Sequence, residues 1–257
     1  MKKTLLLLIF ALVAIVSELS AQGMTVAQIE KKVSELNSRL PLDMGDGLTL
    51  ERMAVESGYV VMDCKAPTTD KSALENTKGD EFVIQARKAG VRSMYSDYLS
   101  AGLGAKQISR FADTGKSVTL SFSSQELKRM MSYPAEAYTN LWDLVKSTRE
   151  DLPLDIGDGL TMTKCYCTMD EVVTTYDCDP NVYTLEVFER LQQGLQEQHD
   201  DFLKEIVNGT SELIDIAKVT AAAGFGYSIY YYIKGQQPSS LTLTYQELAN
   251  ALGINNK

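Results

Sequence analysis

The sequence predicts an α+β protein built from two tandem copies of one α-β-β-α-β-β unit. The first observation is a run near the start, LPLDMGDGLT at 40–49, that returns as LPLDIGDGLT at 152–161 with one difference. The second is that similar helical and strand patterns, separated by glycine-containing turns, follow each run. Four short strands per copy, with helices between the hairpins, predict antiparallel sheets that are each covered by helices on one face.

The N-terminal segment predicts export. Lys2 and Lys3 precede an unbroken apolar run at 5–16, and small residues follow it up to Ala21. This is the pattern of a cleaved signal peptide at 1–21, because the apolar run is too short to span a bilayer. We therefore expect a periplasmic or secreted protein with repeat unit 1 at 22–133, repeat unit 2 at 134–257, and no integral membrane segment after cleavage.

The charge balance excludes one class of partner. The chain carries 25 basic and 34 acidic residues, for a net charge of −9. A protein binds nucleic acid largely by replacing phosphate counter-ions with its own lysines and arginines. An acidic chain is poorly suited to that exchange, so we expect no nucleic-acid partner.

Each copy is expected to open with a helix and a hairpin. Apolar residues spaced by three and four define the first helix of each copy; they are Val26, Ile29, Val33 and Leu36 in one and Tyr138, Leu141 and Val145 in the other. The first hairpin turns at Ser57-Gly58, and its counterpart is predicted to turn at 169–172. That second turn would be two residues longer, which makes Cys178 the counterpart of Cys64 in the second copy.

The second half of each copy is expected to hold a long helix and a second hairpin. The first such helix falls roughly within 80–100, and the second runs from near Phe188 to Ile206. Each second hairpin ends in a capping-box pattern, Ser123-x-x-Glu126 and Thr244-x-x-Glu247, that opens a short helix.

Four cysteines in an exported chain favour disulfide bonds. Strand alternation points all four towards the core. Three complete pairings of Cys64, Cys165, Cys167 and Cys178 remain open, and Cys165 with Cys178 is the best single prediction. Counting back from the predicted turn sets those two one diagonal step apart. Cys165 with Cys167 is the poorest pair, because neighbours of this spacing on a strand lie near the limit of bridging distance.

The residues offer little for catalysis. His199 is the only histidine, and its place on an apolar helix stripe favours a partly buried side chain with a hydrogen-bond partner. A histidine-rich zinc site is excluded, no catalytic serine motif accompanies His199, and the C-x-C spacing is not the redox motif. We expect no cofactor and no bound metal, and an enzyme is less favoured than a binding protein.

Two alternatives remain open beside a binding role. A calcium-stabilised structural module could use four aspartates of the repeated run: Asp43, Asp46, Asp155 and Asp158. These lack the full ligand spacing of an EF-hand loop, so a tight turn is favoured. The other alternative is a hydrolase that uses acidic residues in a cleft between the copies.

Tyrosines near the C-terminus are the best candidates for partner contact. If Tyr231 faces the core, alternation places Tyr230 and Tyr232 on the other face of the strand. Exposed tyrosines are good contact residues for proteins and glycans. The matching strand of the first copy has Ile108 to Phe111 and no tyrosine, so the copies differ where an interaction surface would lie. The alternative is plain strand propensity, with the rings covered.

The repeated run and its hairpins resemble a family of small uncharacterised exported bacterial proteins. Those carry a Leu-Pro run with a D-x-x-T element before their first hairpin, matched here by 46–49 and 158–161. The resemblance covers each copy separately and implies no activity. The layout of two tandem units is also similar to that of secreted β-lactamase-inhibitor proteins, from which no residue is carried over. The sequence therefore favours an exported, non-catalytic binding or interaction protein of the bacterial envelope with an unknown protein or glycan partner.

Overall fold

The computed structural model describes residues 23–44, 47–69, 77–208 and 213–254, and the chain divides into two compact units. Unit 1 comprises Met1–Asn76 and Ile84–Ala135, and unit 2 comprises Thr77–Val83 and Glu136–Lys257. The sequence predicted one boundary at 133/134, whereas a second crossing places Thr77–Val83 in unit 2. The predicted signal peptide at 1–21 lies outside the described residues. Over the four ranges just given, no helix has both the length and the apolar character to cross a bilayer.

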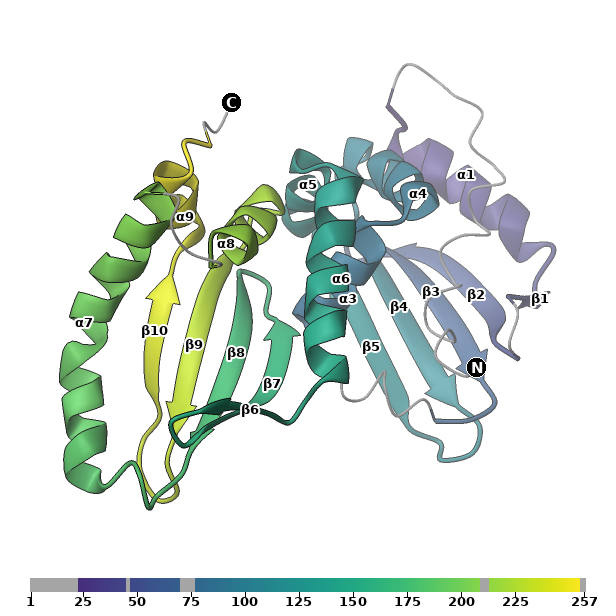
Figure 1. Ribbon diagram of the computed structural model, residues 1–257. Helices are drawn as coiled ribbons and strands as arrows, with labels where there is room; N and C mark the ends of the chain where they lie inside the picture. Colours follow the sequence, from purple (N-terminus) through teal and green to yellow (C-terminus); the bar gives the residue numbers. More distant parts are fainter. Residues whose placement is uncertain (1–22, 45–46, 70–76, 209–212, 255–257) are drawn as a thin grey trace. The chain divides into compact units, whose positions relative to one another are not determined.

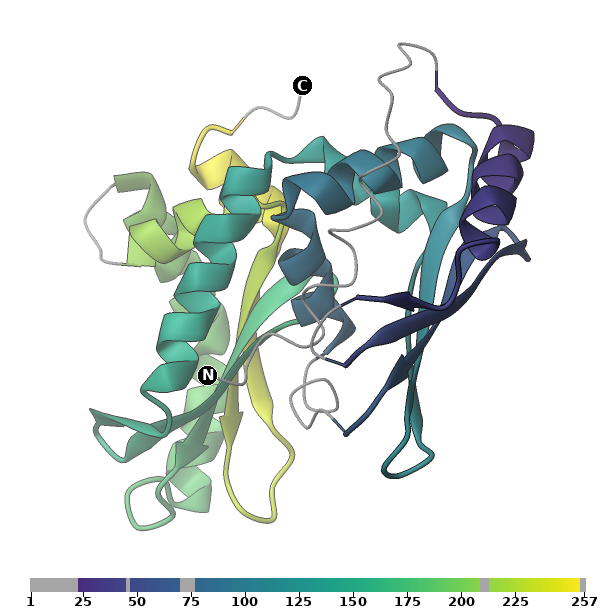
Figure 2. The ribbon, with the colours of Figure 1, turned by 90° about the vertical axis from the view of Figure 1, so that its right-hand side faces the viewer.

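Unit 1 is built on a five-stranded sheet with the order β1-β2-β3-β4-β5 (Figure 1). Its elements are α1 (Val26–Asn37), β1 (Leu42–Asp43), β2 (Thr49–Glu56), β3 (Tyr59–Ala66), α4 (Ala89–Ser100), β4 (Gly104–Phe111), β5 (Ser117–Phe122) and α5 (Ser124–Ser132). α3 (Lys78–Ala86) precedes α4, and most of it belongs to unit 2. Helix α1 packs along β2, as Figure 2 shows, and buries Ile29 and Val33. These are the two central residues of the predicted stripe, while Val26 at its start is 40 % exposed.

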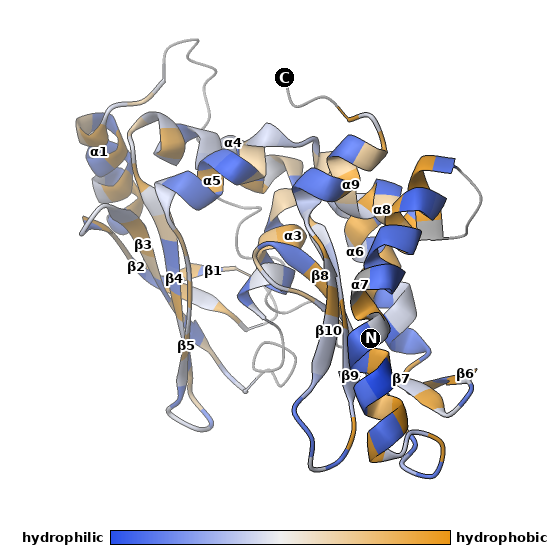
Figure 3. Ribbon diagram, turned by 90° about the vertical axis from the view of Figure 1, so that its left-hand side faces the viewer, coloured by the Kyte–Doolittle hydropathy of each residue, from blue (hydrophilic) through white to orange (hydrophobic). Residues whose placement is uncertain are grey.

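Unit 2 has the same layout, with the sheet order β10-β9-β8-β7-β6. Its elements are α6 (Ala135–Glu150), β6 (Leu154–Gly157), β7 (Leu160–Cys167), β8 (Glu171–Cys178), α7 (Leu185–Asn208), α8 (Leu213–Ala222), β9 (Gly226–Tyr232), β10 (Ser239–Leu243) and α9 (Tyr245–Ala251). Helix α7 lies along β10, and Figure 3 shows apolar and polar stretches alternating along its ribbon. That alternation is expected of a helix with one buried stripe.

The predicted α+β class is confirmed, but the sheets are mixed rather than antiparallel. The hairpin partners run antiparallel, while the central neighbours β3 and β4, and likewise β8 and β9, run parallel. Helices lie between the two strands of each parallel pair, and such a crossover returns the chain to the end of the sheet where the earlier strand began. The strand patterns locate the hairpins in the sequence but not the direction in which one hairpin joins the next.

The repeated ten-residue run supplies the fifth strand of each sheet. Leu42 pairs with Leu50 and Leu154 pairs with Met162, so the start of each run lies antiparallel to the strand that follows it. The Leu40-Pro41 and Leu152-Pro153 peptide bonds are both cis. The sequence predicts only a tight turn after a helix here, because a strand of two to four residues is too short to give an alternating pattern.

The two sheets share one register. Pairing partners on β2 and β3 recur on β7 and β8 with 112 added to both residue numbers. The matched pairs include Thr49–Lys65 with Thr161–Asp177, Leu50–Cys64 with Met162–Tyr176, and Met53–Met62 with Cys165–Thr174. A bulge also interrupts both pairings at the same place, between residues 50 and 52 and between residues 162 and 164.

This common register corrects the predicted second turn. The backbone N–H of Thr168 donates to the carbonyl of Glu171 at 2.8 Å, so the turn is only two residues long. The first hairpin also turns through two residues, and no two-residue change in offset occurs. The place of Cys64 is therefore taken by Tyr176 and not by Cys178.

A buried ion pair holds the Thr77–Val83 segment within unit 2. Arg149 Nη2 lies 2.7 Å from both carboxylate oxygens of Asp80, whose side chain is 1 % exposed. Asp80 Oδ1 also accepts the backbone N–H of Cys167 at 2.8 Å. Phe82 then packs among Tyr138 and Phe225, with ring centroids 5.9 and 6.2 Å away. The segment thus completes part of the unit 2 core.

Candidate functional site

One face of the unit 2 sheet is packed against α7. Tyr176, Ile229 and Leu241 form a cluster there, joined by α7 side chains and by Tyr231. The ring of Tyr231 stacks on that of Tyr176, with centroids 5.8 Å apart. Because side chains alternate along a strand, the neighbours of Tyr231 lie on the opposite face.

Tyr230 and Tyr232 occupy that opposite face, as alternation predicted. Their rings stack with centroids 6.5 Å apart and an interplanar angle of 28°. Tyr232 is 40 % exposed, and Tyr230 is half-buried. The two rings therefore present a paired aromatic surface with part of its area open to contact.

Tyr166 belongs to the same face and was not among the predicted contact residues. It lies between the buried Cys165 and Cys167 on β7, so alternation turns it away from the α7 side. Partial burial raises the pKa of its phenol, and the nearby Tyr232 and Tyr230 raise it further. The signal was available in the sequence, because inward cysteines at 165 and 167 require an outward residue at 166. We call Tyr166, Tyr230 and Tyr232 the tyrosine face.

The floor of the tyrosine face is polar and satisfied. Ser228 is fully buried; its hydroxyl donates to Glu171 Oε2 at 2.7 Å and lies 2.8 Å from Thr242 Oγ1. Thr175 is 3 % exposed, and its Oγ1 lies 3.1 Å from Thr163 Oγ1. Buried hydroxyls with partners fix the strands without adding reactive groups. The Ser228 hydroxyl lies beside a carboxylate but is fully buried, so the arrangement supports contact with a partner and does not present that hydroxyl to solvent.

The same face of unit 1 has different chemistry. Arg52 donates to both Asp63 and Glu56 at 2.8 Å, and Arg110 reaches Asp63 at 3.4 Å. Lys106 lies over the ring of Tyr59, 5.7 Å from its centroid. We call this set the charged face.

The shared register shows which residue of the charged face corresponds to which residue of the tyrosine face. Adding 112 on β2 and 122 on β4 sets three unit 1 positions on the tyrosines of unit 2. The matched positions are Ala54 with Tyr166, Ile108 with Tyr230, and Arg110 with Tyr232. The two sheets thus differ in side chains on a shared strand framework.

The predicted Cys165–Cys178 disulfide is wrong. Cys165 pairs with Thr174 and Cys178 with Leu160, which sets the two cysteines four residues apart along the hairpin. Four strand residues span about 13 Å, far beyond bridging distance. The prediction failed because the turn is two residues shorter than expected. All four cysteines are buried free thiols.

His199 is a partly buried helix residue with hydrogen-bond partners, as its place in the sequence predicts. Its side chain is 17 % exposed, with Nε2 3.3 Å from Glu247 Oε1 and Nδ1 3.1 Å from Asp200 Oδ1. Glu247 also completes the capping box of α9 through Thr244. The imidazole therefore links α7 to the start of α9.

The aspartates of the repeated run serve the turn in unit 2. Asp155 Oδ1 accepts the backbone N–H of Gly157 at 2.9 Å, and Asp158 adopts a left-handed φ of 52°. Asp46 lies outside the described residues. Among the residues that are described, no group of three or more His, Cys, Asp or Glu side chains could hold a metal ion.

Comparisons with known proteins add little. No family model matches the chain, and no curated protein does. A crystal structure from Pseudomonas aeruginosa, described as that of a "putative secreted protein", is similar over 41 % of this chain and 99 % of its own. The identity is 11 % and the TM-score 0.28, too low to support an argument about fold or function.

Proposed function

We propose that this chain is an exported, non-catalytic binding protein of the bacterial envelope that contacts a protein or glycan partner through the tyrosine face. Export rests on the signal-peptide pattern at 1–21. The supporting observation for the surface is that three tyrosines replace Ala54, Ile108 and Arg110 on an otherwise matched strand framework.

Physical chemistry favours tyrosine for this role. A tyrosine ring contributes a large contact area, loses little conformational entropy when it is fixed, and keeps a hydroxyl for hydrogen bonding. Tyrosines are also enriched among residues that dominate binding energy. Tyr230 and Tyr232 are already stacked on each other, so part of the ordering cost of binding is met before the partner arrives.

The side chains most suited to catalysis are otherwise engaged, which supports a binding role. His199 contacts Glu247 and Asp200 at a helix junction. The pocket beneath α7 is lined by aliphatic, aromatic and alanine side chains, with no carboxylate pair of the kind that glycoside hydrolysis needs.

The test is capture from an envelope extract with a double variant, Tyr230→Ser with Tyr232→Ser. The proposal expects the variant to lose at least about tenfold in affinity, since two contact aromatics each contribute on the order of 1–2 kcal/mol. The matched control is Ile108→Ser with Arg110→Ser, which changes the same two strand positions of unit 1 and should leave capture intact.

Two further arms make the result decisive. Digesting the extract with protease, or with glycosidases, separates a protein partner from a glycan. Circular dichroism of both double variants shows whether they remain folded. Equal capture by the folded tyrosine variant and the wild type would remove the proposal.

A further inference from the structure

The start of α3 occupies a defined place on the edge of β7 in unit 2. The backbone N–H of Cys167 donates to Asp80 Oδ1 at 2.8 Å, and the carbonyl of Cys167 accepts the Thr77 hydroxyl. Thr77 also caps the helix, because its Oγ1 accepts the N–H of Asp80 at 3.1 Å. One capped helix start thus satisfies both backbone groups that this strand residue turns off the sheet.

Two further side-chain positions of α3 fit this place. A Cβ atom at Gly79 would collide with the carbonyl of Thr168, so the helix start needs a glycine here. Phe82 packs against Tyr138, with ring centroids 5.9 Å apart, and Tyr138 is fully buried. The occupant in unit 2 therefore has the pattern threonine, any residue, glycine, aspartate, any residue, phenylalanine.

Unit 1 has the same place on β2, and the shared register locates it. Adding 112 to Val55 gives Cys167, and adding 112 to Asn37 gives Arg149. The side chains of Asn37 and Arg149 each donate to the strand carbonyl two residues before Val55 or Cys167. The two places are therefore built on the same backbone positions.

Val55 turns a backbone N–H and a carbonyl off the edge of β2. The N–H and carbonyl of Met53 bond the side chain of Asn37, which lies beyond that edge. Backbone groups two residues apart on a strand point the same way, so those of Val55 also point off the edge. None of the residues that the structure describes bonds these two groups there. Val55 is half-buried, whereas the matching Cys167 is fully buried.

An apolar side chain is also exposed at the matching place of unit 1. Val26 corresponds to Tyr138 by the same offset and is 40 % exposed, whereas Tyr138 is fully buried against Phe82. The next residue of the α1 stripe, Ile29, is only 2 % exposed. Unit 1 therefore exposes the two features that Thr77–Val83 covers in unit 2, a backbone pair at a strand edge and an apolar helix residue.

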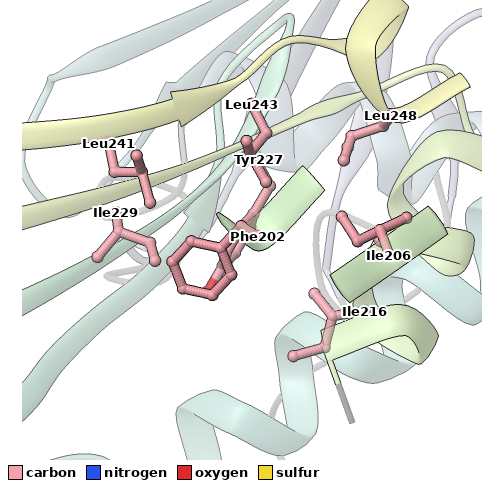
Figure 4. A pocket seen from close by; sticks show the side chains of 9 residues that line it. Phe202, Ile206, Ile216, Tyr227, Ile229, Leu241, Leu243 and Leu248 are labelled. Atoms are coloured by element: carbon pink, nitrogen blue, oxygen red, sulfur yellow. The ribbon is translucent and has the colours of Figure 1, made fainter. Parts of the chain in front are cut away.

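A second copy of this chain has no spare segment with the required chemistry. Helix α3 ends at residue 86 and α7 at residue 208, a difference of 122, so the counterpart of Thr77–Val83 lies near the end of α7. Phe202 takes the place of Asp80 there and has no hydrogen-bonding side chain. Its ring packs on the sheet of unit 2 itself, as Figure 4 shows.

We propose that the place on unit 1 formed by Val55 and Val26 receives the start of a helix from another protein, with the pattern Ser/Thr-x-Gly-Asp/Asn-x-aromatic. The hydroxyl and the acid or amide oxygen pair with the carbonyl and N–H of Val55, and the ring covers Val26. Backbone groups at a strand edge are a recurrent site of recognition. Asn37 is neutral, so the partner needs no charge where Asp80 pairs with Arg149 in unit 2. The site is separate from the tyrosine face and does not rest on it.

The probe is a synthetic peptide with the sequence of residues 77–86 of this chain, which carries the pattern. NMR titration of the protein without its predicted signal peptide should show saturable shifts of the Val55 amide and the Val26 methyl groups. Val26→Asp puts a charge into the apolar contact and should weaken binding at least tenfold. The matched control is Val187→Asp, which changes a valine of similar exposure in the first turn of α7 and should leave binding unchanged.

Two changes in the peptide test the contact without altering the protein. Gly79→Ala favours the helix but adds the Cβ atom that the strand edge excludes, so it should abolish binding. Asp80→Asn should keep the affinity within about threefold, because the oxygen that accepts the Val55 N–H remains.

Four results would overturn the proposal. They are the absence of saturable binding at millimolar peptide, equal binding of the Gly79→Ala peptide, shifts at Cys167 in place of Val55, and self-association of the protein that Val26→Asp abolishes. The third would mean that the peptide displaces the native segment from unit 2, and the fourth would assign the place to a second copy.

Discussion

The two sheets carry different chemistry on one strand framework. Unit 1 presents linked charges, in which Arg52 and Arg110 converge on Asp63, while unit 2 presents the stacked Tyr230 and Tyr232. Strand order, pairing register and bulge position are the same in both. The two sheets therefore keep one backbone pairing with different side chains on the matching face, which are cross-strand ion pairs in unit 1 and stacked rings in unit 2.

The largest contrast in stability should come from Arg149 and its unit 1 counterpart, Asn37. Arg149 pairs with Asp80, whose carboxylate is 1 % exposed. Arg149→Ala would leave that carboxylate buried with one partner fewer, at a cost of about 3–5 kcal/mol in the free energy of unfolding. Urea denaturation measures the loss. A loss below about 1 kcal/mol would mean that Asp80 is not held as described.

Asn37→Ala should cost less at the matching position of unit 1. The Asn37 amide donates to the carbonyl of Met53 at 2.7 Å and accepts its N–H at 2.9 Å. Near the surface, water can replace both of these hydrogen bonds, so their removal lowers the free energy of unfolding by about 1–2 kcal/mol. Urea denaturation should give Arg149→Ala a much lower free energy of unfolding than Asn37→Ala. The reverse order would contradict the comparison.

Acid should affect the capping box of unit 2 through Glu247. Partial burial opposes ionisation of this carboxyl, but hydrogen bonds from Thr244 and the nearby His199 outweigh it and lower its pKa from the ordinary 4.5. A lowered pKa in the folded state adds stability above pH 4.5, and that stability is lost as pH falls through the lowered pKa. Glu247→Gln should therefore destabilise the protein by under about 1 kcal/mol at pH 6 and have almost no effect near pH 3. A larger effect of the substitution at pH 3 than at pH 6 would contradict this assignment.

The smallest expected effect is that of a reductant, which should not change the melting temperature because the four cysteines are free thiols. Burial raises the pKa of Cys64 to about 12 and of Cys165 to about 11, and these thiols are therefore protonated and unreactive at neutral pH. Dithiothreitol should leave the melting temperature unchanged. A thiol reagent should label the native protein slowly and all four cysteines after unfolding. A fall in melting temperature on reduction would show that a disulfide forms.

The sequence predicts the local elements of this fold well. The capping boxes at Ser123 and Thr244, the buried stripe of α1 and the second hairpins all follow from short-range patterns. The parallel central pairing and the transfer of Thr77–Val83 to unit 2 do not, because both depend on contacts between residues far apart in the chain. The Asp80–Arg149 pair spans 69 positions and leaves no local signal.

The tyrosine face was predictable where it depends on one strand and not where it depends on two. Alternation along a single strand placed Tyr230 and Tyr232 on the face opposite Tyr231. Tyr166 was missed because it lies on another strand, although its cysteine neighbours fixed its direction. The disulfide prediction failed by two residues of register, since one shorter turn moves every pairing beyond it.

Hydroxyl-radical footprinting of the tyrosines in the presence and absence of envelope extract tests the central claim most directly. Tyr59 is a half-buried tyrosine on the charged face of unit 1 and serves as the internal control. Our account predicts that the partner protects Tyr230 and Tyr232 from oxidation and leaves Tyr59 unchanged. Equal protection of all three, or protection of Tyr59 alone, would contradict it.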